Sequence, residues 1–485
     1  MAQLPVAAVL AALERRAGVT VVQSARGGLG PTGLMSRAAA AAGVGNGVKA
    51  LVIARASDRK ATAGVTQALR RAGLPPMVQE VSDAWATEAH VTSLTATAKR
   101  VGVGAVVGVG CGATLNLAKA VAGRVTNPTL AASPGDVWRL ATRSLPLITW
   151  PTTPSLDATL RSCRTMRGDG VLQEAAPTAD SAHVAVLDAQ AADDVAPREL
   201  WAASVAALCG AVEVGAAAVG PLDTAGAHAL ILAACASVGA VAAAGDAAAL
   251  SPEWRDCLLH TQATLGCLVG GGGPAPPSDA IMRVITERYH AVAAEVGGGL
   301  APEVVDWAGD AIEDRLAAIE GDGDDGDDDD DTHRGSRGGS SNVAVPPALL
   351  PAIEALLLAP SYPGPGTVLP ALLAAFPLPP AATVGAGASD THRALENAAL
   401  RLTLYRHTAS YLTNTAAMFA SWRAGIASLE GRMPPATRRA LWSALGLKDA
   451  DETAVAEAGE VERACTAFPV APSAKDIRSM LAVLR

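Results

Sequence analysis

The sequence predicts an α/β domain built on a parallel sheet, followed by an all-α domain. Two observations lead to this prediction. Short apolar runs alternate with helix-like runs over residues 1–193, and only helical patterns follow from about Pro197 onward. Alternating strands and helices are typical of a parallel sheet that is covered by helices on both faces. We therefore expect a domain boundary between residues 193 and 194, with the helical domain running over 194–485.

The individual elements follow from local patterns. Apolar runs, some rich in β-branched residues, predict strands, and helix-forming runs that end in glycine or basic residues predict helices. The strands of the first domain are expected at 51–53, 77–81, 103–109, 147–150 and 184–187, with helices at 60–72, 88–101 and 113–121. Later helices are expected at 199–219, 225–249, 252–269, 279–296, 303–319, 394–425, 435–445 and 474–484.

Residues 321–342 form an acidic insert, with eight Asp between Gly321 and Asp331 and no apolar residue that could anchor the insert before Val343. Such a composition predicts a disordered, solvated loop. A site for a cation or a basic partner is the alternative interpretation.

Composition excludes several classes of function. The formal net charge of −9 comes mostly from the insert, so the rest of the chain is nearly neutral. A neutral body gives no electrostatic reason to expect a nucleic-acid or anionic-membrane partner. The seven cysteines are scattered, without a CxxC pair, which favours reduced intracellular thiols. The N-terminus lacks a signal-peptide pattern, and the uncharged 224–245 segment is mostly Ala, so we expect a cytoplasmic protein with a buried helix there.

The stretch 101–123 is the most informative part of the chain. A buried-strand pattern runs into Gly108, Gly110 and Gly112, and a helix-forming run follows directly. Such a junction presents backbone N–H groups and a positive helix end to a phosphate, and glycine permits close approach. Ligands of parallel sheets bind at the carboxyl ends of the strands, where Gly110 and Thr152 are both expected. A tight strand-to-helix turn without a ligand is the alternative.

Segments in the right order resemble the iron-type (group III) alcohol dehydrogenase family, which includes glycerol dehydrogenase and maleylacetate reductase. They are GCGATLNLAK at Gly110–Lys119, LITWPTTPSLDAT at Leu147–Thr159, and the run His183–Glu213. The C-terminal segment Ser473–Arg485 is also similar to the end of the family's chain.

The resemblance implies an N-terminal Rossmann-like nucleotide-binding domain, a helical second domain, and NAD or NADP as cofactor. The cofactor-binding positions that it implies are Gly110, Cys111, Gly112, Asn116, Lys119, Thr152, Thr153 and Ser155. Asn116 stands where the family has Asp. Leu156 and Asp157 replace part of a glycine-containing loop, which brings bulk and negative charge close to the phosphates. A capped loop after a strand is the alternative interpretation of the two threonines.

The same resemblance predicts that the family's metal site is lost. Its helical Asp and His, four residues apart, align with Ala206 and Gly210, neither of which can bind a cation. The later histidine segment aligns with Asp279–Arg283 and then His290. We therefore expect no stoichiometric transition metal, and Arg283 or His290 would have to polarise a carbonyl substrate instead.

Two functions remain open at this point. The first is an NAD(P)-dependent oxidoreductase that acts on a small alcohol or carbonyl compound. The second is a catalytically inactive relative that serves as a binding or scaffold protein. A small-molecule substrate is the expected partner of an active enzyme, and a homodimer is compatible with either function. Arg55, next to an expected strand, is a candidate partner for the 2′-phosphate of NADP.

Overall fold

The structure is a computed structural model, and the residues that it describes fall mainly in the first 195 positions. They are residues 14–15, 17–23, 30–81, 86–128, 137–166, 172–193, 195, 252–270 and 473–483, with single positions within 203–214, 277–281 and 304–317. The expected helices at 225–249, 394–425 and 435–445 and the acidic insert at 321–342 lie outside the described residues.

A six-stranded sheet forms the centre of the α/β domain. Its strands, in spatial order, are β1 (Thr20–Gln23), β9 (His183–Leu187), β6 (Leu147–Pro151), β4 (Ala105–Gly110), β2 (Ala50–Arg55) and β3 (Pro76–Val81). Every neighbouring pair is parallel. The predicted parallel sheet is therefore confirmed. β1 was not among the predicted strands because TVVQ is short and carries polar residues at both ends.

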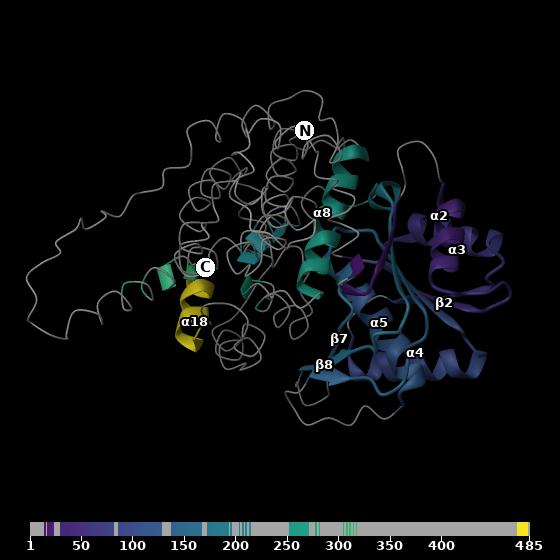
Figure 1. Cartoon of the computed structure of the whole chain (residues 1–485), viewed down its shortest axis with the longest axis horizontal. Coiled ribbons are helices and arrows are strands. Elements are labelled where there is room, and N and C mark those ends of the chain that lie inside the picture. The colour runs from purple at the N-terminus through teal and green to yellow at the C-terminus, as the bar shows by residue number, and fades with distance from the viewer. Residues whose placement is uncertain are drawn as a thin grey trace, which may run out of the picture.

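Helices cover both faces of this sheet, as the alternating pattern predicted (Figure 1). On one face α2 (Pro31–Ala41) and α3 (Arg59–Arg71) share a core with the sheet, which includes Leu34, Leu69 and Trp150. On the other face α4 (Glu88–Val101) and α5 (Gly112–Thr126) form a second core with alternate strand residues such as Leu51 and Ile53. Successive strand residues point to opposite faces, so each strand supplies both cores.

The helix α5 is enclosed on all sides, and every residue from Gly112 to Gly123 is buried. It lies on β4 so closely that a Cβ atom at Gly108 would be 2.8 Å from the Cβ of Ala118. Its outer side packs against β7 of a small second sheet. This sheet has the order β5 (Val137–Arg139), β8 (Leu172–Ala176), β7 (Cys163–Met166), with β7 antiparallel to β8, and was not predicted from the sequence.

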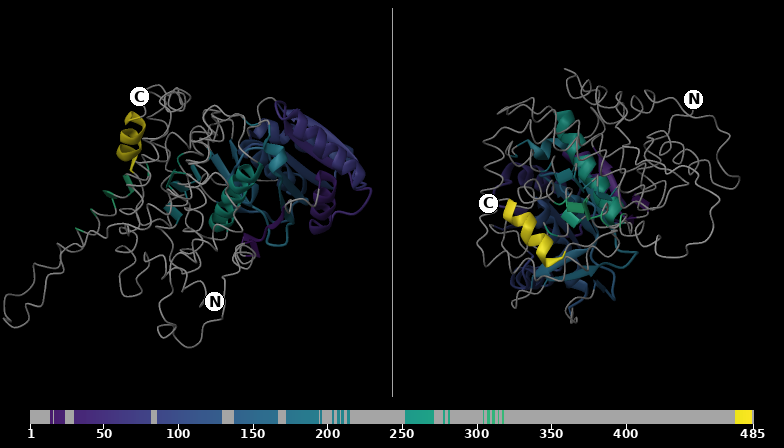
Figure 2. Two further views of the ribbon diagram at one scale, coloured as in Figure 1. Left: turned by 90° about the horizontal axis from the view of Figure 1, so that it is seen from above. Right: turned by 90° about the vertical axis from the view of Figure 1, so that its left-hand side faces the viewer.

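The helix α8 (Pro252–Gly270) stands beside the α/β domain (Figures 1 and 2). It packs on two short 3₁₀ helices, η1 (Leu156–Ala158) and η2 (Ala189–Ala192), which follow β6 and β9. Gly266 allows this contact, because a Cβ atom there would collide with the Leu156 carbonyl oxygen and the Thr159 hydroxyl. Thus α8 fixes the loop that follows β6.

The predicted helices at 252–269 and 474–484 correspond to α8 and α18 (Ala474–Val483). Among the described residues no strand follows β9, which agrees with the predicted change to helices. No helix in the described part of the chain is long and apolar enough to cross a membrane.

Candidate functional site

The turn between β4 and α5 lies at the carboxyl edge of the main sheet, at the position predicted from the sequence. Gly110 ends β4 with φ at 150°, a backbone conformation that side chains disfavour. Cys111 is the N-cap residue of α5, and its side chain makes no capping hydrogen bond. The first turn of α5 therefore presents backbone N–H groups and the positive helix end at this edge.

The loop after β6 crosses in front of this turn. A Cβ atom at Gly112 would be 2.6 Å from the Ser155 Oγ and 3.0 Å from the Asp157 Oδ2. The structure thus brings Ser155 and Asp157 to the start of α5, and Gly112 has no side chain that would fill the space between them. Thr152 and Thr153 are both about 2% exposed at the end of the same strand.

Asp157 forms an ion pair with Lys119 from the second turn of α5. The Lys119 Nζ lies 2.9 Å from the Asp157 Oδ1 and also donates to the Ser162 carbonyl oxygen at 3.3 Å. The lysine side chain is only 2% exposed, whereas the aspartate is 21% exposed. Consequently the charge of Lys119 is balanced inside the protein, and the carboxylate lies at the edge of the candidate site.

Asp58 joins the ends of β2 and β6 at this edge. Its carboxylate accepts hydrogen bonds from the Thr152 hydroxyl at 2.8 Å and from the Arg55 Nε and Nη2 at 3.2 and 3.0 Å. Sequence reasoning missed Asp58. Its place directly before α3, in the run Ser-Asp-Arg-Lys, was an available signal, because Asp is a preferred residue at helix starts.

Asn116 is not brought to the glycine turn. Its side-chain amide donates to the Arg164 carbonyl oxygen at 2.8 Å, and its Oδ1 accepts from the Arg164 N–H at 2.9 Å. The side chain therefore pairs with the backbone of β7, as a neighbouring strand would. Its assignment to the cofactor came from its place in the glycine motif, which does not show which side of α5 faces the small sheet.

A third acidic group follows the end of β9. Asp188 is buried and accepts from the Gln190 N–H at 3.1 Å. Burial raises its pKa, and the neighbouring carboxylates of Asp193 and Asp256 act in the same direction. Asp193 also forms an ion pair with Arg255 of α8 at 2.7 Å, so this corner connects the sheet to α8.

The structure describes part of the positions that the sequence resemblance aligns with metal ligands. Gly210 is helical and buried, and a Cβ atom there would be 3.0 Å from the Leu265 Cδ2 of α8. A larger residue at this position would require the Leu265 side chain to move. Glu213 is fully buried and accepts from the Ser278 N–H at 3.2 Å and from its hydroxyl at 2.7 Å.

Among the described residues no group of three His, Cys, Asp or Glu side chains could hold a metal ion. Asp279, Arg283 and His290 lie outside the described residues, so their predicted roles stay predictions.

Chemically, the edge combines a helix start, a glycine turn and small hydroxyl groups, which suit a phosphate or diphosphate. The Asp157 carboxylate at the same place opposes such a ligand.

Comparison with known proteins agrees with this architecture. Residues 31–186 match the family model described as iron-containing alcohol dehydrogenase. No curated protein matches the sequence.

Solved structures share the fold. A 1,3-propanediol oxidoreductase has a TM-score of 0.60 at 15% identity, with 96% of this chain and 98% of that one covered. An iron-containing alcohol dehydrogenase from Thermococcus thioreducens has a TM-score of 0.55 at 14% identity and the same coverage of both chains. A maleylacetate reductase from Rhizobium sp. strain MTP-10005 has a TM-score of 0.51 at 16% identity, over 96% of this chain and 95% of that one.

Proposed function

We propose that this chain is a member of the iron-containing alcohol dehydrogenase family, whose model matches residues 31–186, and that it is an NAD(P)-dependent oxidoreductase that acts on a small alcohol or carbonyl substrate. The observation that carries the proposal is the junction of β4 and α5, where a glycine turn and the start of a buried helix lie beside the Ser155 hydroxyl at the carboxyl edge of the sheet.

The residues at this junction fit a diphosphate. Gly112 has no side chain, so the Ser155 hydroxyl and the Asp157 carboxylate approach the first turn of α5 closely. The backbone N–H groups of this turn would bind phosphate oxygens, and the Ser155 hydroxyl lies on the same side. Thr152 and Thr153 would line the cofactor from β6, with Thr152 held in place by Asp58.

The bound nicotinamide would donate or accept a hydride, and the protein must position the substrate and stabilise charge on its oxygen. The proposal includes no metal-assisted step, because Ala206 and Gly210, which the resemblance aligns with the family's helical ligands, lack donor atoms. We therefore assign the polarising role to Arg283 or His290 as hydrogen-bond donor or acid, following the sequence alignment.

A second function is favoured by one observation. The Asp157 carboxylate lies beside Gly112, where a diphosphate would add further negative charge. A chain with this residue and without the family's helical metal ligands could serve as a binding or scaffold protein that has no dehydrogenase activity.

A titration with NADH and NADPH, followed by nicotinamide fluorescence, tests the proposal. Gly112→Val should abolish binding, because its side chain would enter the space in front of α5 and displace Ser155 and Asp157. Gly45→Val is a matched control, since Gly45 is exposed and has no atom within 4 Å of its Cβ position. If the wild-type protein binds NAD(P)H and a folded Gly112→Val variant binds it with the same affinity, this site is excluded.

Metal analysis of protein purified without chelators separates the chemical alternatives. Metal-free protein that oxidises NAD(P)H with a carbonyl compound supports the altered dehydrogenase. One equivalent of iron or zinc that is lost in Asp279→Ala would show that the alignment of the metal ligands is wrong. Metal-free protein that neither binds nor oxidises NAD(P)H supports the inactive relative.

A further inference from the structure

Arg55 and Asp58, at the carboxyl end of β2, form a charged pair at the edge that holds the candidate site. The Asp58 Oδ1 accepts from the Arg55 Nε at 3.2 Å and from its Nη2 at 3.0 Å. The arginine side chain is 24% exposed and the aspartate 9%, so the pair is mostly enclosed but still meets the solvent. In the main sheet β2 is the neighbour of β4, which ends in the glycine turn. The pair therefore lies beside the place where a diphosphate is expected.

The Asp58 carboxylate also reaches across the end of β4. Its Oδ2 accepts from the hydroxyl of Thr152, the residue that follows β6, at 2.8 Å. Since β4 lies between β2 and β6, this hydrogen bond spans the carboxyl end of β4. The Thr152 N–H donates in turn to the Gly110 carbonyl oxygen at 3.0 Å. Asp58 is thus connected through one residue to the glycine that ends β4.

Asp58 stands where two positive groups would otherwise favour an anion. It is the N-cap residue of α3, but its side chain makes no capping hydrogen bond and faces Arg55 and Thr152 instead. A helix start and a guanidinium both attract phosphate. The carboxylate balances the charge of this edge and opposes a further anion there. The exposed Arg59 and Lys60 in the first turn of α3 offset this effect only weakly, because water screens exposed charges.

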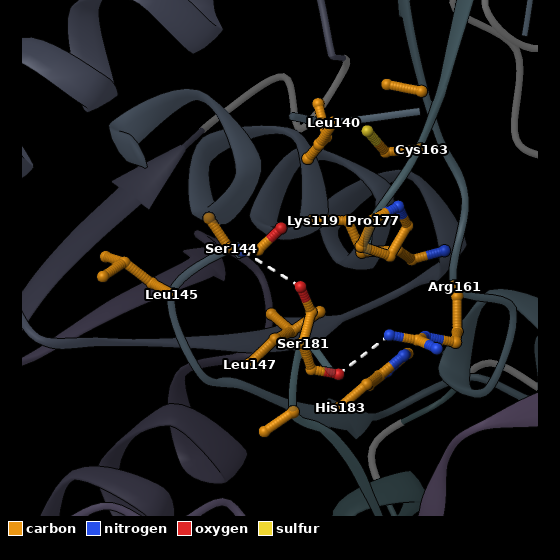
Figure 3. Close-up of a pocket in the computed structure, with 13 residues that line it drawn as sticks. Lys119, Leu140, Ser144, Leu145, Leu147, Arg161, Cys163, Pro177, Ser181 and His183 are labelled. Atoms are coloured by element: carbon orange, nitrogen blue, oxygen red, sulfur yellow. Dashed lines mark hydrogen bonds between the residues drawn. The ribbon is translucent and has the colours of Figure 1, made fainter. Parts of the chain in front are cut away.

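Arg161 shows how this chain binds a guanidinium without balancing its charge. It lines a small pocket with His183 at the opposite edge of the main sheet (Figure 3). Its Nη2 donates to the backbone carbonyl oxygens of Thr178 and Ser181 at 2.7 and 2.8 Å. Carbonyl oxygens satisfy the donors of an arginine but carry no net charge. The carboxylate at Arg55 does both, so it changes the charge that a ligand meets at this edge.

The two dinucleotide cofactors differ at the position that such an edge recognises. In dinucleotide-binding sheets an acidic residue near the glycine turn accepts from the ribose 2′-hydroxyl of NAD, whereas a nearby arginine accommodates the 2′-phosphate of NADP. This chain holds both groups, bound to one another. A carboxylate oxygen can accept more than one hydrogen bond, so the Asp58 Oδ2 can accept from a ribose hydroxyl while it keeps Thr152. A 2′-phosphate would meet the Asp58 charge, and Arg55 would have to leave its partner to bind it.

We propose that Asp58 is a specificity-determining residue that makes this chain prefer NAD(H) to NADP(H). This selectivity rests on the proposed function, because it requires the NAD(P) site at the junction of β4 and α5. It also limits the role that the sequence suggests for Arg55. The arginine alone favours a 2′-phosphate, but its ion pair with Asp58 removes that preference.

Fluorescence titrations of the wild-type protein with NADH and NADPH provide the first test. NADH should bind about tenfold more tightly, or better, since a like charge within a few ångströms opposes the 2′-phosphate. Adenosine 2′,5′-bisphosphate should also compete for the site less well than 5′-AMP. Equal affinities, or a preference for the 2′-phosphorylated compounds, would overturn the selectivity and leave the NAD(P) site standing. If neither dinucleotide binds, the site itself is refuted and the selectivity with it.

Variants of the full chain then assign the selectivity to Asp58. Asp58→Asn keeps the size of the side chain and an acceptor oxygen but removes the charge, so the affinity for NADPH should rise about tenfold relative to that for NADH. Adding Arg55→Ala should abolish this gain, because the released guanidinium holds the phosphate. Asp58→Ser, which keeps a preferred residue at a helix start, should change the ratio in the same direction if Asp58→Asn does not fold.

Asp180→Asn is the matched control, because it removes one charge from an exposed turn at the opposite edge of the sheet. It should leave the ratio of the two affinities unchanged. If a folded Asp58 variant changes both affinities by the same factor, Asp58 only orders the ends of β2 and β6, and its role in selectivity is overturned.

Discussion

Replacement of Asp157 by Asn should strengthen the binding of NADH. The carboxylate lies beside the first turn of α5, with its Oδ2 3.0 Å from the Cβ position of Gly112. A diphosphate at this helix start would therefore carry its charge within a few ångströms of Asp157. Two like charges about 4 Å apart repel by about 1 kcal/mol in bulk water and by about 4 kcal/mol near a protein surface.

The ion pair with Lys119 offsets part of this repulsion, and Asp157 is 21% exposed, so we use the lower part of that range. A gain of about 1.4 kcal/mol corresponds to a dissociation constant about tenfold lower. The amide introduced by Asp157→Asn would keep a hydrogen-bond acceptor for Lys119 but lose the charge. Because Lys119 is 2% exposed, we expect stability to fall by about 1.5–3 kcal/mol, which thermal unfolding measures.

The assay is a fluorescence titration of each folded variant with NADH at fixed ionic strength. Asp180→Asn is the control, since it removes the same charge from the exposed turn before β9, at the opposite edge of the sheet. It should leave the dissociation constant unchanged. An unchanged or weaker affinity in Asp157→Asn would refute the placement of the diphosphate at this turn. Binding that appears only in Asp157→Asn would show that the aspartate alone blocks the wild-type site.

Three further predictions concern stability, pH and cofactor choice. Gly266→Ala should destabilise the protein by about 1–3 kcal/mol in denaturant unfolding, because the added methyl meets the backbone of η1. The control Gly64→Ala in α3, where the Cβ position has no atom within 4 Å, should instead stabilise the protein by about 0.5–1 kcal/mol. A change of the same sign in both variants would contradict the packing of α8. His183 has a folded-state pKa of about 3 against 6.5 for the free side chain, so the unfolded chain binds its proton first and stability falls as pH drops from 6.5 toward 3. The loss is up to about 1.4 kcal/mol per pH unit, and His183→Gln should remove this part of the slope; an identical slope in both proteins would show that the imidazole ionises normally. If Arg55 binds the 2′-phosphate, Arg55→Ala should weaken the binding of NADPH by about 1.5–3 kcal/mol relative to that of NADH. An equal change in both affinities would exclude that role.

Local sequence patterns predicted the main sheet well and the small sheet not at all. β4 and β6 are buried on both faces, so their residues form continuous apolar runs that single out strands. β7 reads Cys-Arg-Thr-Met, and its Arg164 backbone pairs with the Asn116 side chain of α5. Its strand partner β8 is close in sequence, but neither strand contains a continuous apolar run, so the local pattern did not predict them.

The sequence predicted the backbone turn of the candidate site, but not the hydrogen bonds and the ion pair between its side chains. Glycines at the end of an apolar run indicate a turn, and this was sufficient to locate Gly110 and Gly112. The partners of Lys119 could not be predicted, because Asp157 lies 38 positions away in the chain and reaches α5 through the loop after β6. The same applies to Asp58 and Thr152, which are 94 positions apart.

The place of β9 between β1 and β6 has a consequence for how the chain folds. Thr20 on β1 pairs with Val184 on β9. β1 therefore cannot pair in the main sheet until nearly 190 residues have been synthesised. Pairing of such distant segments is slow, because a long loop must close before the contacts form. On the ribosome β2, β3, β4 and β6 can assemble first, and β6 then exposes an unpaired, apolar edge until β9 emerges. Polypeptides that end before residue 183 should therefore aggregate, whereas those that extend past 187 close the sheet.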